Sequence, residues 1–162
     1  MAKFKYRMQN ILDIKNQMEE QAKLEFAQAR MALNEEEDHL KKLNSRKRSY
    51  ENEMRKLLHE NLKVRKIIEA RDAISKMEGM IEEQILKVRF AEKKLEEARQ
   101  KMTELMQERK THENLKEKAF DVFIKELNAG ESKEIDQLTS YRFGKKINEQ
   151  SETGKESEQS ED

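Results

Sequence analysis

Hydrophobic residues recur along the chain at alternating steps of three and four residues, most clearly from Ile74 to Phe123. Two interleaved series with a step of seven make up this run. They are Ile74, Ile81, Val88, Leu95, Met102, Arg109, Lys116 and Phe123, and Met77, Gln84, Ala91, Ala98, Leu105, His112 and Ala119. Such a heptad stripe lies on one face of a helix, which one helix alone cannot bury. The run therefore predicts a long helix packed against a partner helix.

An earlier stripe has the length and spacing that this partner requires. Its members are Met8, Ile11, Lys15, Met18, Ala22, Phe26, Ala29, Leu33, Glu36, Leu40, Leu43, Lys47, Tyr50, Met54 and Leu57. Near Ala22 one line of the stripe shifts by a residue. A helix of 3.6 residues per turn drifts against a 3.5-residue repeat, so such a shift keeps the stripe facing its partner.

The stripes are interrupted over residues 58–66, which places a turn between two helices. We predict a first helix over about residues 5–58, a turn over about 59–66, and a second helix over about 67–127 that stops at Asn128-Ala129-Gly130. Arms of nearly equal length with a short turn fold back antiparallel. Because neither Gly nor Pro marks the turn, an uninterrupted helix that dimerises is the alternative.

Residues 131–143 carry apolar residues at helical spacing and predict a short helical segment. Residues 144–162 are mostly Ser, Glu, Gln and Gly, which predicts a disordered acidic tail. The expected fold is therefore all-α. It is a long antiparallel two-helix coiled-coil hairpin, with the short C-terminal helical segment, over residues 1–143, followed by the tail.

The composition excludes several classes of protein but does not by itself identify a function. Charged residues make up 42% of the chain, with 34 basic and 34 acidic residues, so the basic face that nucleic acid requires is not expected. The absence of Cys excludes disulfides and thiolate metal sites. No apolar run has the length of a membrane span, and the N-terminus lacks the apolar core of a signal peptide. We predict a cytoplasmic protein.

Residues suited to catalysis or ligand binding are scattered along the chain rather than grouped. His39, His59 and His112 do not have metal-ligand spacing, and no glycine-rich phosphate loop is present. A two-helix hairpin also offers no deep pocket. We therefore expect no enzymatic activity, no cofactor and no metal, and a protein that acts through its surfaces.

Three basic residues, Lys15, Arg109 and Lys116, interrupt the stripes toward the end of the predicted hairpin where its termini meet. Like charges repel, although Glu19 and Glu113 could offset part of this repulsion. One interpretation is that the long side chains cover the seam with their aliphatic stems. The other is an end kept loose or cationic for a partner.

Both ends of the chain resemble the FliJ family of flagellar type III export proteins. The start, MAKFKYRMQNILDIKNQMEEQAKLEFAQA, has a basic and aromatic lead followed by Leu12-Asp13-Ile14-Lys15 and a helix rich in Gln and Glu. The segment ESKEIDQLTSYRF supplies Lys133, Ile135, Asp136 and Gln137 after the second helix. The resemblance covers about residues 1–147.

The resemblance implies an antiparallel coiled coil similar to the stalk of rotary ATPases. It implies insertion into the ring of the hexameric export ATPase FliI, binding to the export gate protein FlhA, and escort of empty export chaperones. The expected location is the cytoplasm at the flagellar base, peripheral to the inner face of the cell membrane through these partners.

The resemblance also suggests residues for each contact. The expected gate-binding face comprises Leu43, Tyr50, Ala73, Met77 and Met80. The expected ATPase-binding set comprises Lys3, Phe4, Lys5, Tyr6, Arg7, Phe120, Phe123 and Lys125. Aromatic residues flanked by cations can anchor in a channel while steering toward acidic loops. The bland interpretation of these aromatics is that they close the end of the hairpin.

Two other functions fit a long coiled coil. A generic structural coiled coil would oligomerise through its stripe, whereas a hairpin buries its stripe between its own two arms and can remain a monomer. A rotor subunit of a rotary ATPase would need an additional globular portion, for which the chain has no room.

Overall fold

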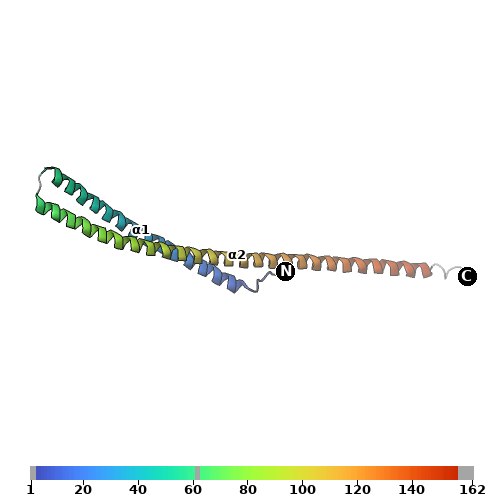
Figure 1. Ribbon diagram of the computed structural model, residues 1–162. Helices are drawn as coiled ribbons and strands as arrows, with labels where there is room; N and C mark the ends of the chain where they lie inside the picture. The colour runs from blue at the N-terminus through green and yellow to red at the C-terminus, as the bar shows by residue number, and fades with distance from the viewer. Residues whose placement is uncertain (1–2, 61–62, 157–162) are drawn as a thin grey trace. The chain divides into compact units, whose positions relative to one another are not determined.

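The computed structural model describes residues 3–60 and 63–156, with side chains described as far as residue 144. These ranges contain helix α1, Gln9–Glu60, and helix α2, Val64–Glu156 (Figure 1). Contacts divide the chain into two compact units. We call residues 10–111 the hairpin unit, and residues 1–9 with 112–162 the terminal unit. The predicted all-α fold is confirmed.

The helices of the hairpin unit lie side by side and run antiparallel (Figure 1). Lys15 Nζ lies 2.6 Å from the Glu108 carboxylate, and Lys47 Nζ lies 3.1 Å from that of Glu78. Residue numbers on α2 therefore fall as those on α1 rise. The change of direction lies between the end of α1 at Glu60 and the start of α2 at Val64, within the range predicted for the turn.

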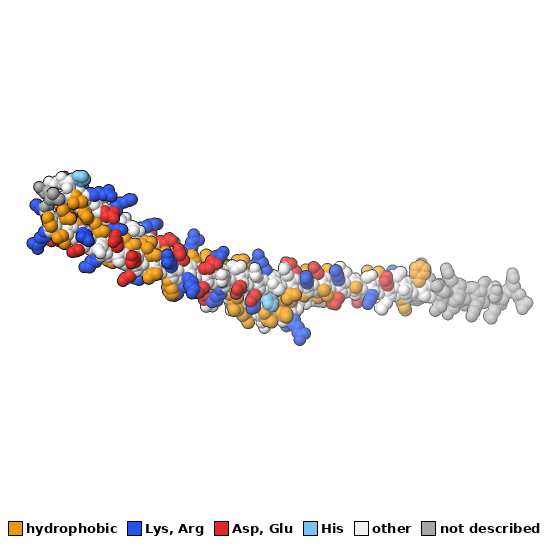
Figure 2. Space-filling model, in the orientation of Figure 1, with side chains coloured by type: hydrophobic (Ala, Val, Ile, Leu, Met, Phe, Trp, Pro, Cys, Tyr) orange, Lys and Arg blue, Asp and Glu red, His pale blue; other side chains and the backbone are white. Residues whose placement is uncertain are grey.

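The predicted stripe of α2 faces inward along its whole length. Every member of both series from Ile74 to Phe123 is buried or half-buried. Met77, Ala91 and Leu105 are among the most buried apolar residues of the hairpin unit. Elsewhere on the hairpin, acidic and basic side chains alternate over the surface (Figure 2). The heptad spacing alone was sufficient to identify the buried face of this helix.

The predicted stripe of α1 is correct at Lys15 and from Ala22 onward, and it is wrong at Met8, Ile11 and Met18. Met8, Ile11 and Met18 are 40%, 41% and 41% exposed, whereas Leu12 and Glu19 are buried. The buried line therefore keeps one heptad register without the shift that was predicted. An acidic residue at a buried position concealed this register. Its members are Leu12, Lys15, Glu19, Ala22, Phe26, Ala29, Leu33, Glu36, Leu40, Leu43, Lys47, Tyr50, Met54 and Leu57.

Polar pairs bridge the two helices at several levels of the seam. Arg109 donates a hydrogen bond to Glu19, whose side chain is 4% exposed. The Gln84 amide donates to the carbonyl oxygen of Glu36 at 3.0 Å and also to its carboxylate. Polar groups at seam positions satisfy one another only in one alignment of the helices. Such groups are the best-attested way to fix coiled-coil register.

The Glu19 pair resolves the charge repulsion expected from the sequence. Burial alone raises the pKa of Glu19, but hydrogen bonds from Arg109 and Lys23 outweigh burial and hold that pKa below its ordinary value of 4.5. Lys15 is likewise paired with Glu108. Acids of the opposite arm therefore offset the charges of Lys15 and Arg109, as the sequence suggested for Glu19.

The lowered pKa of Glu19 makes the stability of the hairpin dependent on pH. A carboxylate whose folded pKa is depressed stabilises the fold above its unfolded pKa, and that contribution is lost as the pH falls through the folded pKa. We expect the free energy of unfolding to decline below about pH 4.5. The decline should be shallower in Glu19→Gln than in the wild type when urea unfolding is followed at each pH.

The matched control for this titration is Glu25→Gln, because Glu25 also has a lowered pKa, caused chiefly by its hydrogen bond from Lys101. That pair is more exposed, so its contribution should be smaller and should weaken in salt. If Glu19→Gln has the same acid dependence as the wild type, the Glu19 pair does not contribute to pH-dependent stability.

The bounds of both helices differ from the prediction at the chain ends. Residues 3–6 are not helical, and α1 begins at Gln9 rather than near residue 5. The predicted stop at Asn128-Ala129-Gly130 is wrong, because α2 continues to Glu156. Helix thus replaces the separate segment over 131–143 and the disorder predicted for 144–156, while 157–162 lie outside the described residues.

The physical reason for the missed stop is the modest effect of glycine. Each glycine inside a helix costs about 1 kcal/mol relative to Ala, and no proline follows to enforce an end. A glycine cap requires a positive φ, which no described glycine adopts. Glu, Lys, Leu and Ala dominate the neighbouring positions and favour continuation of the helix.

Removal of residues 144–162 should leave the hairpin as stable as before. Every residue from 128 to 144 is exposed, and the sequence beyond has no apolar stripe with which to pack. We expect a melting temperature within about 2 °C of the wild type and a smaller helical circular dichroism signal per molecule. A fall of many degrees would show that the removed residues pack against the rest of the chain.

Candidate interaction surfaces

The first five described residues form a non-helical segment of the terminal unit, in which Arg7 begins the turn that leads into α1. Phe4 and Tyr6 are half-buried, whereas Lys3, Lys5 and Arg7 are exposed. Burial therefore alternates along the segment, with the aromatic side chains turned toward the protein and the cations toward solvent. The Gln9 amide donates to the Tyr6 carbonyl oxygen at 3.3 Å where the segment joins α1.

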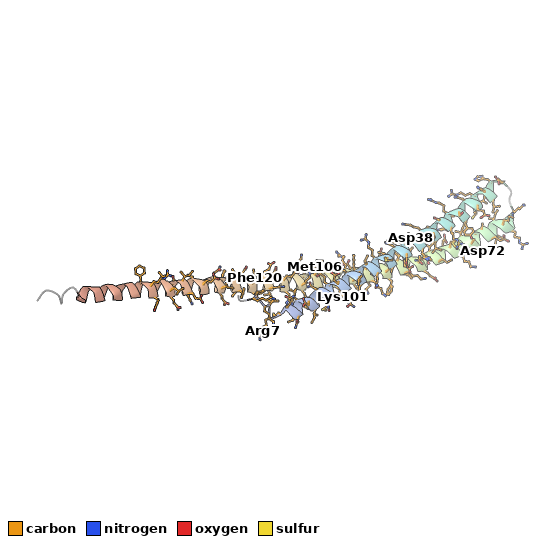
Figure 3. The ribbon with its side chains drawn as sticks, turned by 180° about the vertical axis from the view of Figure 1, so that it is seen from behind. Arg7, Asp38, Asp72, Lys101, Met106 and Phe120 are labelled. Atoms are coloured by element: carbon orange, nitrogen blue, oxygen red, sulfur yellow. The ribbon has the colours of Figure 1, made fainter. Side chains whose placement is uncertain are left out.

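The aromatic side of the segment packs against α2 within the terminal unit. The Phe4 ring lies edge-on to Phe120, with centroids 5.2 Å apart and planes at 79°, and its centroid is 5.5 Å from that of Phe123. These are favourable geometries, contributing about 0.5–1.5 kcal/mol per pair beyond burial. Figure 3 shows Arg7 and Phe120 in this unit. The structure therefore brings together seven of the eight residues expected to bind the ATPase.

An open groove follows this contact between the segment and α2. Its lining is Lys3, Phe4, Lys5, Tyr6, Arg7, Met8, Ala119 and Phe123. The Tyr6 hydroxyl is enclosed without a hydrogen-bond partner among the described residues. Lys125, the remaining residue of the expected set, is exposed on α2 but does not line the groove. Three cations thus surround an apolar groove, an arrangement suited to an acidic protein surface.

The expected gate-binding residues lie at one level of the hairpin unit. The Lys47–Glu78 ion pair places the part of α1 that contains Leu43 and Tyr50 beside the part of α2 that contains Met77. Met77 is buried, whereas Leu43, Tyr50 and Ala73 are half-buried in or beside the seam. Met80 is 44% exposed. A partner at this level would meet Met80 and only the outer edges of the other side chains.

Sequence reasoning named Glu19 as an acid that could offset the seam cations, but it did not pair Glu19 with Arg109 or Gln84 with Glu36, and it found the terminal aromatic cluster. Glu19 and Gln84 are separated from their partners by 90 and 48 residues, so local spacing carries no signal of either pair. The signal that could have indicated the first pair is an acid and a base at heptad positions of opposite arms. Among the residues that the structure describes, no group of three or more His, Asp or Glu is arranged to hold a metal ion.

No helical stretch within residues 3–60 and 63–156 combines the length and apolar content that a bilayer crossing requires. Two long packed helices with a heptad seam define a coiled-coil protein, which also carries a groove lined by cations in its terminal unit. A family model described as flagellar FliJ protein matches residues 4–148. The chain belongs to the FliJ family, a non-catalytic family of flagellar export proteins, which confirms the resemblance at both ends. Searches of curated proteins and of solved structures found no match.

Proposed function

We propose that this chain is the stalk of a flagellar export ATPase and acts by binding rather than by catalysis. The observation that carries the proposal is the terminal unit. There, Phe4 is held against Phe120 and Phe123 while Lys3 and Lys5 remain exposed. The partner is the hexameric export ATPase of the FliI type. Its acidic loops would meet the cations, and apolar side chains would enter the groove.

In the terminal unit, the aromatic and the basic residues have different roles. The aromatic side chains already contact α2, so their main contribution is to hold the segment in place. The basic side chains have no comparable packing role and are available to a partner. A preorganised segment loses less conformational entropy on binding than a free one, which favours affinity.

A stalk alters turnover only if it binds different nucleotide states of the ring with different affinities. An asymmetric helical element inside a ring of identical subunits contacts them unequally, and this inequality provides the difference. The proposal extends to the FlhA-type export gate, which would contact the hairpin around Met80, and to escort of empty export chaperones. These partners would hold the protein at the inner face of the cell membrane.

The test combines co-purification with a titration of ATP hydrolysis. Purified protein should co-elute with the export ATPase and raise its turnover at well below one stalk per ATPase subunit. The protein alone should release no phosphate. Unchanged turnover over a broad titration, with ring assembly confirmed by electron microscopy, would reject the stalk.

The second candidate is a generic structural coiled coil, which the long seam favours. It differs in self-association, because an oligomerising coiled coil buries its stripe against another chain. The hairpin unit instead pairs Lys15 with Glu108 and Lys47 with Glu78 within one chain. Sedimentation of a monomer together with ATPase stimulation would exclude this candidate.

A further inference from the structure

A second apolar surface of the hairpin unit lies outside the seam. Leu86 and Phe90 are four residues apart on α2, and they are 64% and 61% exposed. Neither belongs to the heptad stripe. Figure 2 shows hydrophobic side chains reaching the surface along the hairpin. Two large apolar residues that adjoin on one helix face form an exposed apolar patch, the kind of surface feature that marks a candidate contact site when it lines a groove.

These residues form one wall of an open groove of about 430 Å³. The lining is Ala29, Ala32, Glu36, Leu86, Lys87, Phe90, Ala91 and Lys94. Alanines from both helices make the floor, and their small side chains leave the space that larger residues would fill. The groove therefore arises from the sequence of both arms, with small residues facing a leucine and a phenylalanine.

The charges around the groove are predominantly basic. Lys87 and Lys94 are seven residues apart on α2, and Lys94 Nζ lies 4.7 Å from the Phe90 ring centroid. Glu36 is the acid of the lining, and it keeps its negative charge although its carboxylate accepts a hydrogen bond from the neutral Gln84 amide. Two lysines against one glutamate leave the lining with a net positive charge, which together with its apolar wall favours an anionic, partly apolar partner.

We propose that this groove is a docking site for an acidic amphipathic helix of a partner protein. From Leu86 to Lys94 the groove follows about two turns, roughly 12 Å, of α2. A partner helix with apolar residues three and four positions apart would insert them between Phe90 and the alanine floor, with acids placed toward the lysines. The site shares no residue with the surfaces expected to bind the ATPase or the gate, and it does not depend on that function.

Two other occupants fit the charges less well. A second copy of this chain in a symmetric dimer would place the same patch against itself, bringing Lys87 and Lys94 toward lysines. The acidic tail offers charge, but residues 149–162 contain no apolar residue to fill the groove. The apolar wall and the basic rim together therefore favour a separate, acidic amphipathic helix.

The test uses a fluorescein-labelled synthetic helix of about 14 residues, roughly 20 Å long, with leucines on one face and glutamates elsewhere. Fluorescence anisotropy should show binding to the full chain at low salt. Phe90→Ala and the double variant Lys87→Glu/Lys94→Glu should each weaken binding by about tenfold or more. The double variant should instead prefer a peptide in which lysine replaces every glutamate.

Matched control variants distinguish binding at the groove from nonspecific binding. Leu24→Ala removes an equally exposed apolar side chain, 65% exposed, outside the groove, and Lys76→Glu reverses an exposed charge elsewhere on α2. Both should bind the glutamate peptide as the wild type does, with unchanged circular dichroism. Equal loss in these controls, or equal wild-type affinity for the lysine peptide, would overturn the proposal. So would a wild-type dimer that Phe90→Ala converts to a monomer.

Discussion

Glu19→Ala should lower the free energy of unfolding of the hairpin by about 2–3 kcal/mol at pH 7. Glu19 is 3% exposed and accepts a hydrogen bond from Arg109, so its removal weakens the compensation of a cation held at the seam. Removing one member of a buried ion pair is strongly destabilising because the remaining charge stays desolvated. Urea unfolding followed by circular dichroism measures the change.

The double variant Glu19→Leu/Arg109→Leu should be at least as stable as the wild type. Two leucines at heptad positions bury apolar surface and remove both charges together. The surface control is Asp38→Ala, which removes an exposed ion pair with Lys41 at 3.9 Å and should change stability by less than about 0.5 kcal/mol. If Glu19→Ala behaves like Asp38→Ala, the buried pair has no special role in stability.

The variant with Lys3→Glu, Lys5→Glu and Arg7→Glu should lose about tenfold or more of its apparent affinity for the export ATPase. These side chains are exposed, so their reversal changes the charge presented to a partner and leaves the aromatic packing in place. The readout is the concentration of stalk that gives half-maximal stimulation of ATP hydrolysis. Helical content and melting temperature should match the wild type.

A control with Lys41→Glu, Lys42→Glu and Lys56→Glu makes the same change in net charge at exposed positions of the hairpin and should stimulate normally. Phe4→Ala addresses the other half of the terminal unit. It should release the non-helical segment and speed tryptic cleavage after Lys5, while Phe4→Leu retains most of the packing. Equal losses in the two triple variants would point to net charge rather than to this surface.

Sequence patterns pointed to the aromatic residues that lie together in the terminal unit, and they did not predict the hydrogen-bonded pairs that cross the seam. The basic and aromatic lead was recognised because five adjacent residues alternate between cations and rings. The structure places Phe4 of this lead against Phe120 and Phe123 within the terminal unit. By contrast, Tyr50 and Met77 were expected on a binding face, and the structure places them in the seam.

The groove at Phe90 has a signal in the sequence, which lies outside the heptad stripe. Leu86 and Phe90 are large apolar residues at positions outside the stripe, and alanines occur at Ala29 and Ala32 on the other arm. Neither feature alone indicates a groove. Only the antiparallel register, which brings residue 29 to the level of residues 90 and 91, places the small residues beside the large ones.

The sequence by itself determined the helices, the buried face of α2 and the turn, because heptad spacing is a local property that a helix converts directly into one face. Tertiary structure decided which residues the first arm buries near its start. Glu19 occupies a buried position only because Arg109 reaches it from the other helix, and no local rule anticipates a partner 90 residues away. The continuation of α2 past Gly130 depends on the sum of helix propensities. A penalty of about 1 kcal/mol per glycine does not end a helix whose neighbouring residues favour helix.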